Sequence, residues 1–346
     1  MTVLSDRARA VMEAHWQPEG YTVPNAVTYP FAWLWDSCFH AVIWAALGDD
    51  TRAVTELAHV FRCQDERSGF VPHIDYERAP DHLRDFWGQS GTSTLTQPPM
   101  YGHAVVELQR RGIDVPDEIV ERAGLGVQFF LRQRRHRSGL IAITHPWETG
   151  CDDSPRFDHW GANDAARWYE VKGALVSEPE VGAFDCAPVS LTALVAWNGA
   201  LLGIDTDDLV AALAVRWDVD ARTWVDAGAS EHSSGRARTL EALLPLLVID
   251  QPGAVEQVTD VAAFGAPFGP RGVHRDEPSF DGARYWRGPV WPQLAYLLWL
   301  AGADVAETSV RGASASGLAE YWDADDGTGL GAIPQSWSAL MVLMET

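Results

Sequence analysis

Apolar residues recur every three or four positions along much of this chain, which is the spacing of one face of an α-helix. In residues 51–63, for example, Val54, Leu57 and Phe61 fall on one side of such a helix and Glu56 falls on the other. Strict alternation of apolar and polar residues, the pattern of a half-buried strand, is scarce. The pattern therefore predicts an all-α protein.

Two stretches, residues 187–202 and 289–301, are apolar on nearly every side. A helix with that pattern is buried all round, whereas an amphipathic helix has one exposed face, so the mixture predicts an inner and an outer layer. Twelve helices in inner–outer pairs would form an (α/α)6 barrel. The predicted helices are residues 5–16, 33–47, 51–63, 98–112, 116–136, 185–203, 206–216, 236–249, 253–264, 289–302, 304–320 and 333–345.

The segments between several of these helices are long and rich in Gly, Pro, Trp and Asp. Long loops inside a compact domain are usually functional, so we expect them to form the rim of a site. No shift in composition marks a linker, which predicts a single domain over residues 1–346. The loops are residues 16–32, 64–97, 138–184, 265–288 and 322–332.

The charge of the chain argues against a nucleic-acid partner. Acidic side chains outnumber basic ones by 48 to 26, giving a net charge of −22. A nucleic-acid binder needs a basic face that neutralises phosphates. The densest basic run, Arg132 to Arg137, ends a predicted helix, where cations offset the helix dipole.

The first residues lack the apolar core of a signal peptide, and no apolar run is long enough to cross a bilayer. The four cysteines, Cys38, Cys63, Cys151 and Cys186, stand singly along the chain. Scattered cysteines without a secretory signal are typical of free thiols in a reducing compartment. We therefore expect a cytoplasmic protein with no membrane partner.

Tryptophan is unusually frequent, with 16 residues against 12 Phe and 8 Tyr. Many of these tryptophans lie beside Gly, Pro and acidic residues in the loops. An indole ring offers a flat apolar face and a polar N–H, which suits it to stack on a sugar ring. Some of them are expected to be core residues as well, but the rest indicate a small carbohydrate ligand.

Six motifs follow one another between residue 29 and the end of the chain. They read WDSCFHA, GFVPHI, TQPP, HPWETGCDDSPRFD, YWRGPVWPQ and EYWDADDGTGLG, the last followed by SW. In this order they resemble family 63 of the glycoside hydrolases, above all its bacterial mannosylglycerate and glucosylglycerate hydrolases. The resemblance implies an (α/α)6 barrel and hydrolysis of an α-glycosidic bond with inversion.

The resemblance also implies roles for individual residues. Asp152, in the string around CDDSP, matches the general acid, and Glu320, which opens the EYWD segment, matches the general base. Trp35 and Asp36 match a sugar-binding pair. The remaining expected pocket residues are Gln97, Trp147, Trp286, Arg287, Gln335 and Trp337.

The chemistry of inversion agrees with this pair. An inverting hydrolase needs one protonated carboxyl group on the leaving oxygen and one ionised carboxylate that holds water, about 6.5–9.5 Å apart. Burial and the neighbouring charge of Asp153 would both raise the pKa of Asp152, as an acid at neutral pH requires. Asp153 itself is the alternative acid, and Glu148 and Asp158 are expected to be structural partners.

Other features of the sequence suggest alternative functions. Asp323, Asp325 and Asp326 have the D-x-D-D form of a terpene cyclase, and they also resemble part of a calcium loop, but Pro334 occupies the position of its bidentate Glu. A non-catalytic carbohydrate-binding toroid would keep the indoles and lose a carboxylate. No paired histidine motif, Walker loop or G-x-G-x-x-G turn is present, so we expect no catalytic metal and no nucleotide cofactor.

The leaving group is less well defined by the sequence. In the resembling enzymes, Arg and Tyr side chains grip the glycerate carboxylate, and here only Arg167, Tyr169 and Lys172 could replace them. They lie in the segment 159–184, which looks abbreviated. The aglycone could therefore be glycerate, a second sugar or another small polar group.

Overall fold

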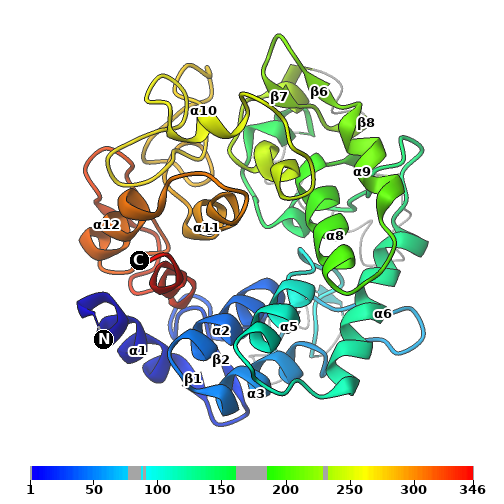
Figure 1. Ribbon diagram of the computed structural model, residues 1–346, viewed down its shortest axis with the longest axis vertical. Helices are drawn as coiled ribbons and strands as arrows, with labels where there is room; N and C mark the ends of the chain where they lie inside the picture. The colour runs from blue at the N-terminus through cyan, green and yellow to red at the C-terminus, as the bar shows by residue number, and fades with distance from the viewer. Residues whose placement is uncertain (1, 77–86, 89–90, 161–184, 229–232, 346) are drawn as a thin grey trace.

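Helices packed in a closed ring form the body of the protein in this computed structural model (Figure 1). The structure describes residues 2–76, 87–88, 91–160, 185–228 and 233–345. Within these ranges no helix is long and apolar enough to cross a membrane.

Six helices form the inner ring, and each contacts the next until the last contacts the first. Their burial explains the apolar stretches of the sequence, because α2 and α8 are enclosed on almost every side. The inner helices are α2 (Leu34–Ala46), α5 (Tyr101–Arg110), α8 (Val189–Leu201), η5 (Glu241–Leu247), α11 (Pro292–Leu300) and η6 (Ser336–Met344).

The amphipathic helices lie outside this ring and bury one face against it (Figure 1). In α3, for example, Ala53, Leu57 and Val60 are buried. The expectation that Glu56 lies on the exposed side was wrong, because Glu56 is buried and accepts the Thr22 hydroxyl over 2.6 Å. The outer helices are α1 (Val3–His15), α3 (Asp50–Val60), α6 (Asp117–Gln133), α9 (Asp207–Ala214), α10 (Val255–Thr259) and α12 (Ala306–Ser316).

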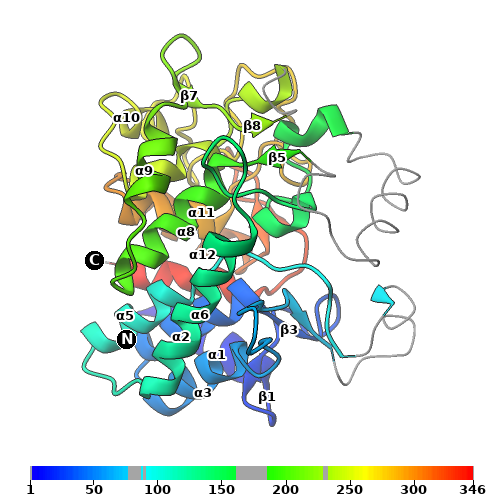
Figure 2. The same cartoon turned by 90° about the vertical axis from the view of Figure 1, so that its right-hand side faces the viewer.

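Among the described residues, ten two-residue strands pair antiparallel in the loops between helices. Figure 2 shows β3 and β5 on the same side of the ring. The pairs are β1 (Trp16–Gln17) with β2 (Tyr21–Thr22), β3 (Ala32–Trp33) with β4 (Ile74–Asp75), β5 (Cys186–Ala187) with β8 (Ala227–Gly228), β6 (Trp217–Asp218) with β7 (Thr223–Trp224), and β9 (Tyr321–Trp322) with β10 (Gly329–Leu330).

The predicted all-α (α/α)6 barrel is confirmed, and every predicted helix has a counterpart. Two counterparts, η5 and η6, are 3-10 helices rather than α-helices. In η5 the cause is Pro245, which lacks an N–H group and clashes with the preceding turn of an α-helix. The single-domain organisation stays a prediction.

The ends of the chain meet where the ring closes. The first helix, α1, contacts the last, η6. The Thr2 hydroxyl donates a hydrogen bond to Glu345 Oε2 over 2.5 Å, and the Ser5 hydroxyl donates to the same oxygen over 3.1 Å. The two termini therefore lie side by side (Figure 1).

Candidate active site

A cavity of about 370 Å³ opens at one end of the ring, where several inner helices begin. Trp35 and Asp36 lie in the first turn of α2, and Gln335 and Trp337 lie where η6 begins. Gln97 precedes α5 by a few residues. Because these segments converge on one end of the barrel, residues far apart in sequence line one space. Its volume is in the range of small-molecule sites.

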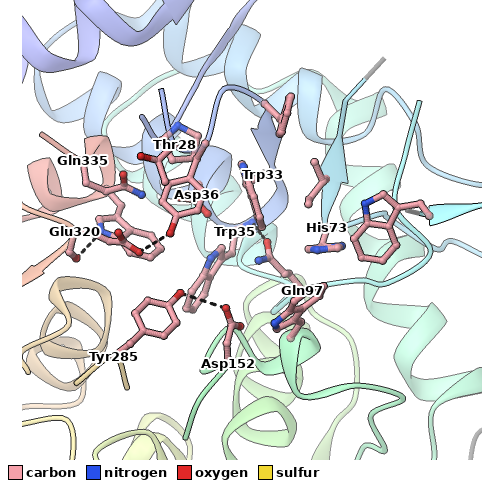
Figure 3. Close-up of a pocket in the computed structure, with 18 residues that line it drawn as sticks. Thr28, Trp33, Trp35, Asp36, His73, Gln97, Asp152, Tyr285, Glu320 and Gln335 are labelled. Atoms are coloured by element: carbon pink, nitrogen blue, oxygen red, sulfur yellow. Dashed lines mark hydrogen bonds between the residues drawn. The ribbon is translucent and has the colours of Figure 1, made fainter. Parts of the chain in front are cut away.

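The lining divides into two ends, which Figure 3 shows on different sides of the cavity. The first, here called the acidic end, is formed by Tyr29, Asp36, Asp152, Tyr285, Glu320 and Gln335. The second, here called the aromatic end, is formed by Phe31, Trp33, His73, Ile74, Trp87 and Trp147.

Asp152 reaches the acidic end from a tightly anchored loop. Gly150, just before it, has a φ of 74°, and a Cβ atom there would lie 2.5 Å from the Trp35 ring, so glycine lets the loop pass close to that ring. Arg156 follows and is fully buried, with its Nη2 atom 2.8 Å from Asp226 Oδ1. Asp152 is therefore held at the cavity from both sides.

The surroundings of Asp152 favour its protonated form. Burial raises the pKa of Asp152 to about 8, and the charges of Glu320 and Asp153 act in the same direction. The Tyr285 hydroxyl, 3.3 Å from Asp152 Oδ2, opposes the shift, because a hydrogen bond to the carboxylate stabilises it. At neutral pH the Asp152 carboxyl carries a proton.

Glu320 lies immediately before strand β9 and is only 2% exposed. Its Oε2 atom accepts the Ala332 N–H over 2.9 Å, and its Oε1 atom accepts the Tyr29 hydroxyl over 3.0 Å. Burial raises the pKa of Glu320, and both hydrogen bonds oppose that rise. These donors favour a carboxylate that can accept a proton.

Gly331 makes room for this carboxylate. It has a φ of 70°, and a Cβ atom at this position would lie 2.4 Å from Glu320 Oε2. The Trp337 indole N–H also donates to the Glu320 carbonyl over 2.9 Å. The backbone and the side chain of Glu320 are thus both held in place.

Asp36 is a third carboxyl group in the cavity. It is 2% exposed, and burial raises its pKa well above the ordinary range, with the charges of Glu320, Glu56 and Asp152 adding to the shift. Such a group suits hydrogen bonding to hydroxyl groups. Gln97 lies nearby, and its Oε1 atom accepts the Trp35 N–H over 3.4 Å.

Eight of the ten sequence-predicted site residues line this cavity, and Trp286 and Arg287 do not. The Trp286 ring stacks on Trp291, with centroids 3.6 Å apart and planes at 1°. This packing, with a backbone φ of 56°, turns the ring away from the cavity.

Arg287 is bound instead by two carboxylates. Its Nη2 atom lies 2.8 Å from Asp153 Oδ1 and 2.6 Å from Asp158 Oδ1. Arg284 pairs with the other oxygen of Asp153. These ion pairs brace the loop behind Asp152, so Asp153 acts as its structural neighbour.

The structure also shows what the acidic residue Glu148 and the acidic segment 323–326 contact. Glu148 is a structural partner, because it forms a buried ion pair with Arg134 at 3.0 Å. Asp323 and Asp326 accept backbone N–H groups within their own turn, and Asp325 pairs with Arg271. Within the described ranges, no group of three or more His, Cys, Asp or Glu side chains could hold a metal ion.

The cavity is also lined by Tyr29, Trp33, His73, Trp87 and Tyr285, which were not among the site residues expected from the sequence. All except Trp87 lie in or beside the quoted motifs. The signal was present there, but the partner of each side chain depends on folding. Arg167, Tyr169 and Lys172 lie outside the described residues.

Comparisons with known proteins agree with this geometry. A family model described as the mannosylglycerate hydrolase MGH1-like glycoside hydrolase domain matches residues 29–338. A mannosylglycerate hydrolase of Thermus thermophilus is 26% identical over 94% of this chain and 96% of that protein. A glucosylglycerate hydrolase of Mycolicibacterium hassiacum is also 26% identical, over 93% of each chain.

A solved structure agrees as well. The crystal structure of a family 63 mannosylglycerate hydrolase from Thermus thermophilus, in complex with Tris and D-glycerate, matches with a TM-score of 0.84 at 25% identity and covers 99% of each chain. These matches leave no support for a terpene cyclase or for a non-catalytic toroid. The chain belongs to the MGH1-like glycoside hydrolases of family 63, which invert the anomeric centre, and it is a glycoside hydrolase.

Proposed function

We propose that the chain hydrolyses an α-glucoside or α-mannoside of a small polar aglycone, with Asp152 as the general acid and Glu320 as the general base. The observation that carries this proposal is the contrast between the two groups in one cavity. The pKa of Asp152 is raised to about 8, whereas the Glu320 carboxylate accepts two hydrogen bonds. One acid and one base of this kind are what inversion requires.

In the proposed step, Asp152 gives its proton to the glycosidic oxygen as the bond between that oxygen and the anomeric carbon breaks. Glu320 takes a proton from a water molecule as the water oxygen bonds to the same carbon from the opposite face. The products are a β-hexose and the free alcohol of the aglycone. Asp152 is left ionised and Glu320 protonated, and exchange of one proton with solvent restores both.

Further residues would bind the sugar at the acidic end. Trp35 and Trp337 offer aromatic surface, with ring centroids 5.9 Å apart and planes at 87°. Asp36, Gln97 and Gln335 are polar, buried and part of the lining, which suits them to bind sugar hydroxyl groups. Trp147 would flank the cleaved bond. Trp286 and Arg287 would act indirectly, by supporting Tyr285 and Asp153.

The relatives support a small aglycone, since the two proteins compared above are hydrolases of mannosylglycerate and of glucosylglycerate. We also propose a cytoplasmic location. The four cysteines form no disulfide bond in the described part of the chain, which is usual in a reducing compartment.

The reaction is tested with α-glucosides and α-mannosides of glycerate and of a second hexose. Proton NMR within minutes of mixing is expected to show the β-anomer first. Asp152→Asn and Glu320→Gln are each expected to lower kcat by about 10²–10⁴, because each removes a proton-transfer group. An α-anomer as first product, or a folded variant with a near-normal rate, would contradict the mechanism.

A further inference from the structure

A chain of buried polar side chains crosses three helices beside the cavity. His40 lies on α2, Glu56 lies on α3, and Ser336 is the first residue of η6. All three side chains are fully buried. The helix α2 packs against both α3 and η6 (Figure 1), so His40 connects an outer helix with the helix that closes the ring.

Each link of this chain is a direct contact between polar atoms. The Glu56 Oε1 atom lies 3.5 Å from His40 Nδ1, and the Ser336 hydroxyl lies 2.7 Å from His40 Nε2. With its other oxygen, Glu56 accepts the Thr22 hydroxyl over 2.6 Å. The Glu56 carboxylate favours a proton on Nδ1 of His40, so that Nε2 accepts the Ser336 hydroxyl.

The Ser–His–Glu order is that of a hydrolytic triad, but Ser336 cannot serve as a nucleophile. Its side chain is fully buried, and it does not line the cavity. Its two neighbours in sequence, Gln335 and Trp337, do line the cavity. The three groups therefore hold the backbone from which Gln335 and Trp337 reach the site.

The start of η6 depends on contacts of this kind. It is a 3-10 helix, whose internal hydrogen bonds have poorer geometry than those of an α-helix. The Ser336 N–H donates to the Pro24 carbonyl over 2.9 Å, and the Ser338 hydroxyl donates to the Ala319 carbonyl over 2.5 Å. Contacts with other segments thus determine where Ser336 lies.

The position of Ser336 bears directly on Glu320. Trp337, the next residue, donates its indole N–H to the Glu320 carbonyl over 2.9 Å. Gln335, the preceding residue, donates its N–H to the Leu318 carbonyl over 2.7 Å. A shift of Ser336 would move the backbone that carries the proposed base, and a displacement of about 1 Å can cost about 10²-fold in rate.

We propose that His40, oriented by Glu56, is a positioning residue for the general base. It acts by fixing Ser336, and thereby the Trp337 indole that holds the Glu320 backbone. This inference rests on the proposed function, because it requires Glu320 to be the base. It extends the residues that control the reaction to the outer helix α3.

The first test breaks the contact between His40 and Ser336. Asn has an amide only near the position of Nδ1, so His40→Asn loses that contact and is expected to lower kcat on the best of the glycosides named above by about 10–100-fold. The loss should be as large on α-glucosyl fluoride, because its hydrolysis still needs the base. His40→Gln, whose longer side chain reaches the position of Nε2, should recover most of the loss.

A second buried histidine provides the matched control. His103 lies on the inner helix α5, is buried, and has its Nε2 atom 3.0 Å from the Tyr296 hydroxyl. It does not line the cavity. His103→Asn therefore loses a comparable buried hydrogen bond, and we expect a similar fall in Tm with kcat within about threefold of the intact enzyme.

The second test asks whether His40 acts through Trp337. Trp337→Phe keeps an aromatic ring but removes the indole N–H that the Glu320 carbonyl accepts. The double variant His40→Asn/Trp337→Phe should lose about as much kcat as the more damaged single variant, because both changes break one chain of contacts. Ser336→Ala, which removes only a hydroxyl group, takes the place of His40→Asn in both tests if that variant fails to fold.

The outcomes separate the two proposals. Fold losses that multiply in the double variant, or a kcat within about threefold of normal in folded His40→Asn, overturn the positioning role and leave the proposed function standing. A loss that is absent on the fluoride, or an equal loss in His103→Asn, overturns it as well. Failure of the intact enzyme to hydrolyse the fluoride or any of the glycosides overturns the proposed function, and the positioning role with it.

Discussion

Asp152 follows a short 3-10 turn in a loop, whereas Glu320 stands at the start of a strand pair. Each carboxyl group meets one tyrosine hydroxyl, Tyr285 for Asp152 and Tyr29 for Glu320. Within the described residues, Glu320 also accepts a backbone N–H, that of Ala332, and Asp152 does not. Asp152 lies instead between two like charges that raise its pKa further. The comparison teaches that burial raises the pKa of both carboxyl groups, and that hydrogen-bond donors and neighbouring charges then push the two pKa values apart.

The kcat values of Asp152→Asn and Glu320→Gln are expected to differ most on a substrate whose leaving group needs no proton. On a glycoside, both Asp152→Asn and Glu320→Gln should lose about 10²–10⁴ in kcat. On α-glucosyl fluoride, Asp152→Asn should lose only about tenfold or less, since fluoride departs unprotonated, while Glu320→Gln should lose as much as before. Release of fluoride measured with an ion-selective electrode checks this.

The reverse pattern, with Asp152→Asn the more damaged variant on the fluoride, would exchange the two roles. Equal large losses on both substrates would mean that Asp152 does more than protonate the leaving group.

A smaller loss of kcat is expected when the Glu320 carboxylate is crowded by a neighbouring residue but not replaced. Gly331→Ala places a methyl group against Glu320 Oε2 and should shift the carboxylate, lowering kcat by about 10–100-fold. Gly112→Ala is the matched control, because Gly112 has a similar positive φ of 79° and no atom near the added Cβ. Both variants carry similar backbone strain, so Gly112→Ala shows the effect of that strain alone on thermal unfolding and turnover, and only Gly331→Ala, which also meets Glu320 and Tyr321, is expected to lose turnover. Similar turnover in the two would contradict the positioning of Glu320 by Gly331.

The smallest effects are expected in the pH dependence of kcat/KM. Activity requires ionised Glu320 and protonated Asp152, so it should fall at low pH through the raised pKa of Glu320 and at high pH near 8. Tyr29→Phe removes a donor from the Glu320 carboxylate and should move the acidic limb up by about one pH unit. Tyr285→Phe should move the alkaline limb up by a similar amount.

One variant therefore narrows the profile and the other widens it. Movement of the same limb in both variants would show that the two tyrosines do not act on separate carboxyl groups. Because the two acids interact, each limb reports an apparent pKa of the pair.

The barrel itself could be predicted from the sequence because the buried positions of a helix recur at a regular spacing of apolar residues. The apolar stretches of α8 and α11 indicated the inner layer, and amphipathic α3 and α6 indicated the outer one. The sequence predicted a helix at η5 but not its 3-10 form, although Pro245 is visible in the sequence. Tertiary packing keeps this segment helical, and the proline changes only the type of helix.

The candidate site could be predicted in part, for a different reason. Motif resemblance pointed to Asp152 and Glu320, but it assigned Trp286 and Arg287 to the lining as well. Those two side chains are directed by a positive φ and by the carboxylates of Asp153 and Asp158. The direction of Arg287 depends on carboxylates over a hundred residues away, which no local pattern records. Trp286 stacks on Trp291 within its own motif, but the backbone turn that allows this stacking is a property of the folded loop.

The closure of the ring by its last element has a consequence for how the protein becomes active. Both proposed catalytic residues are present in a chain that has been synthesised through Gly331, yet Gln335, Trp337 and the η6 helix that joins α2 to α11 are not. A nascent chain at that stage contains the proposed acid and base, but it lacks part of the cavity lining and the last inner helix of the barrel. We therefore expect catalytic competence only when the C-terminal segment docks beside the N-terminal helix, which would couple the onset of activity to completion of the barrel.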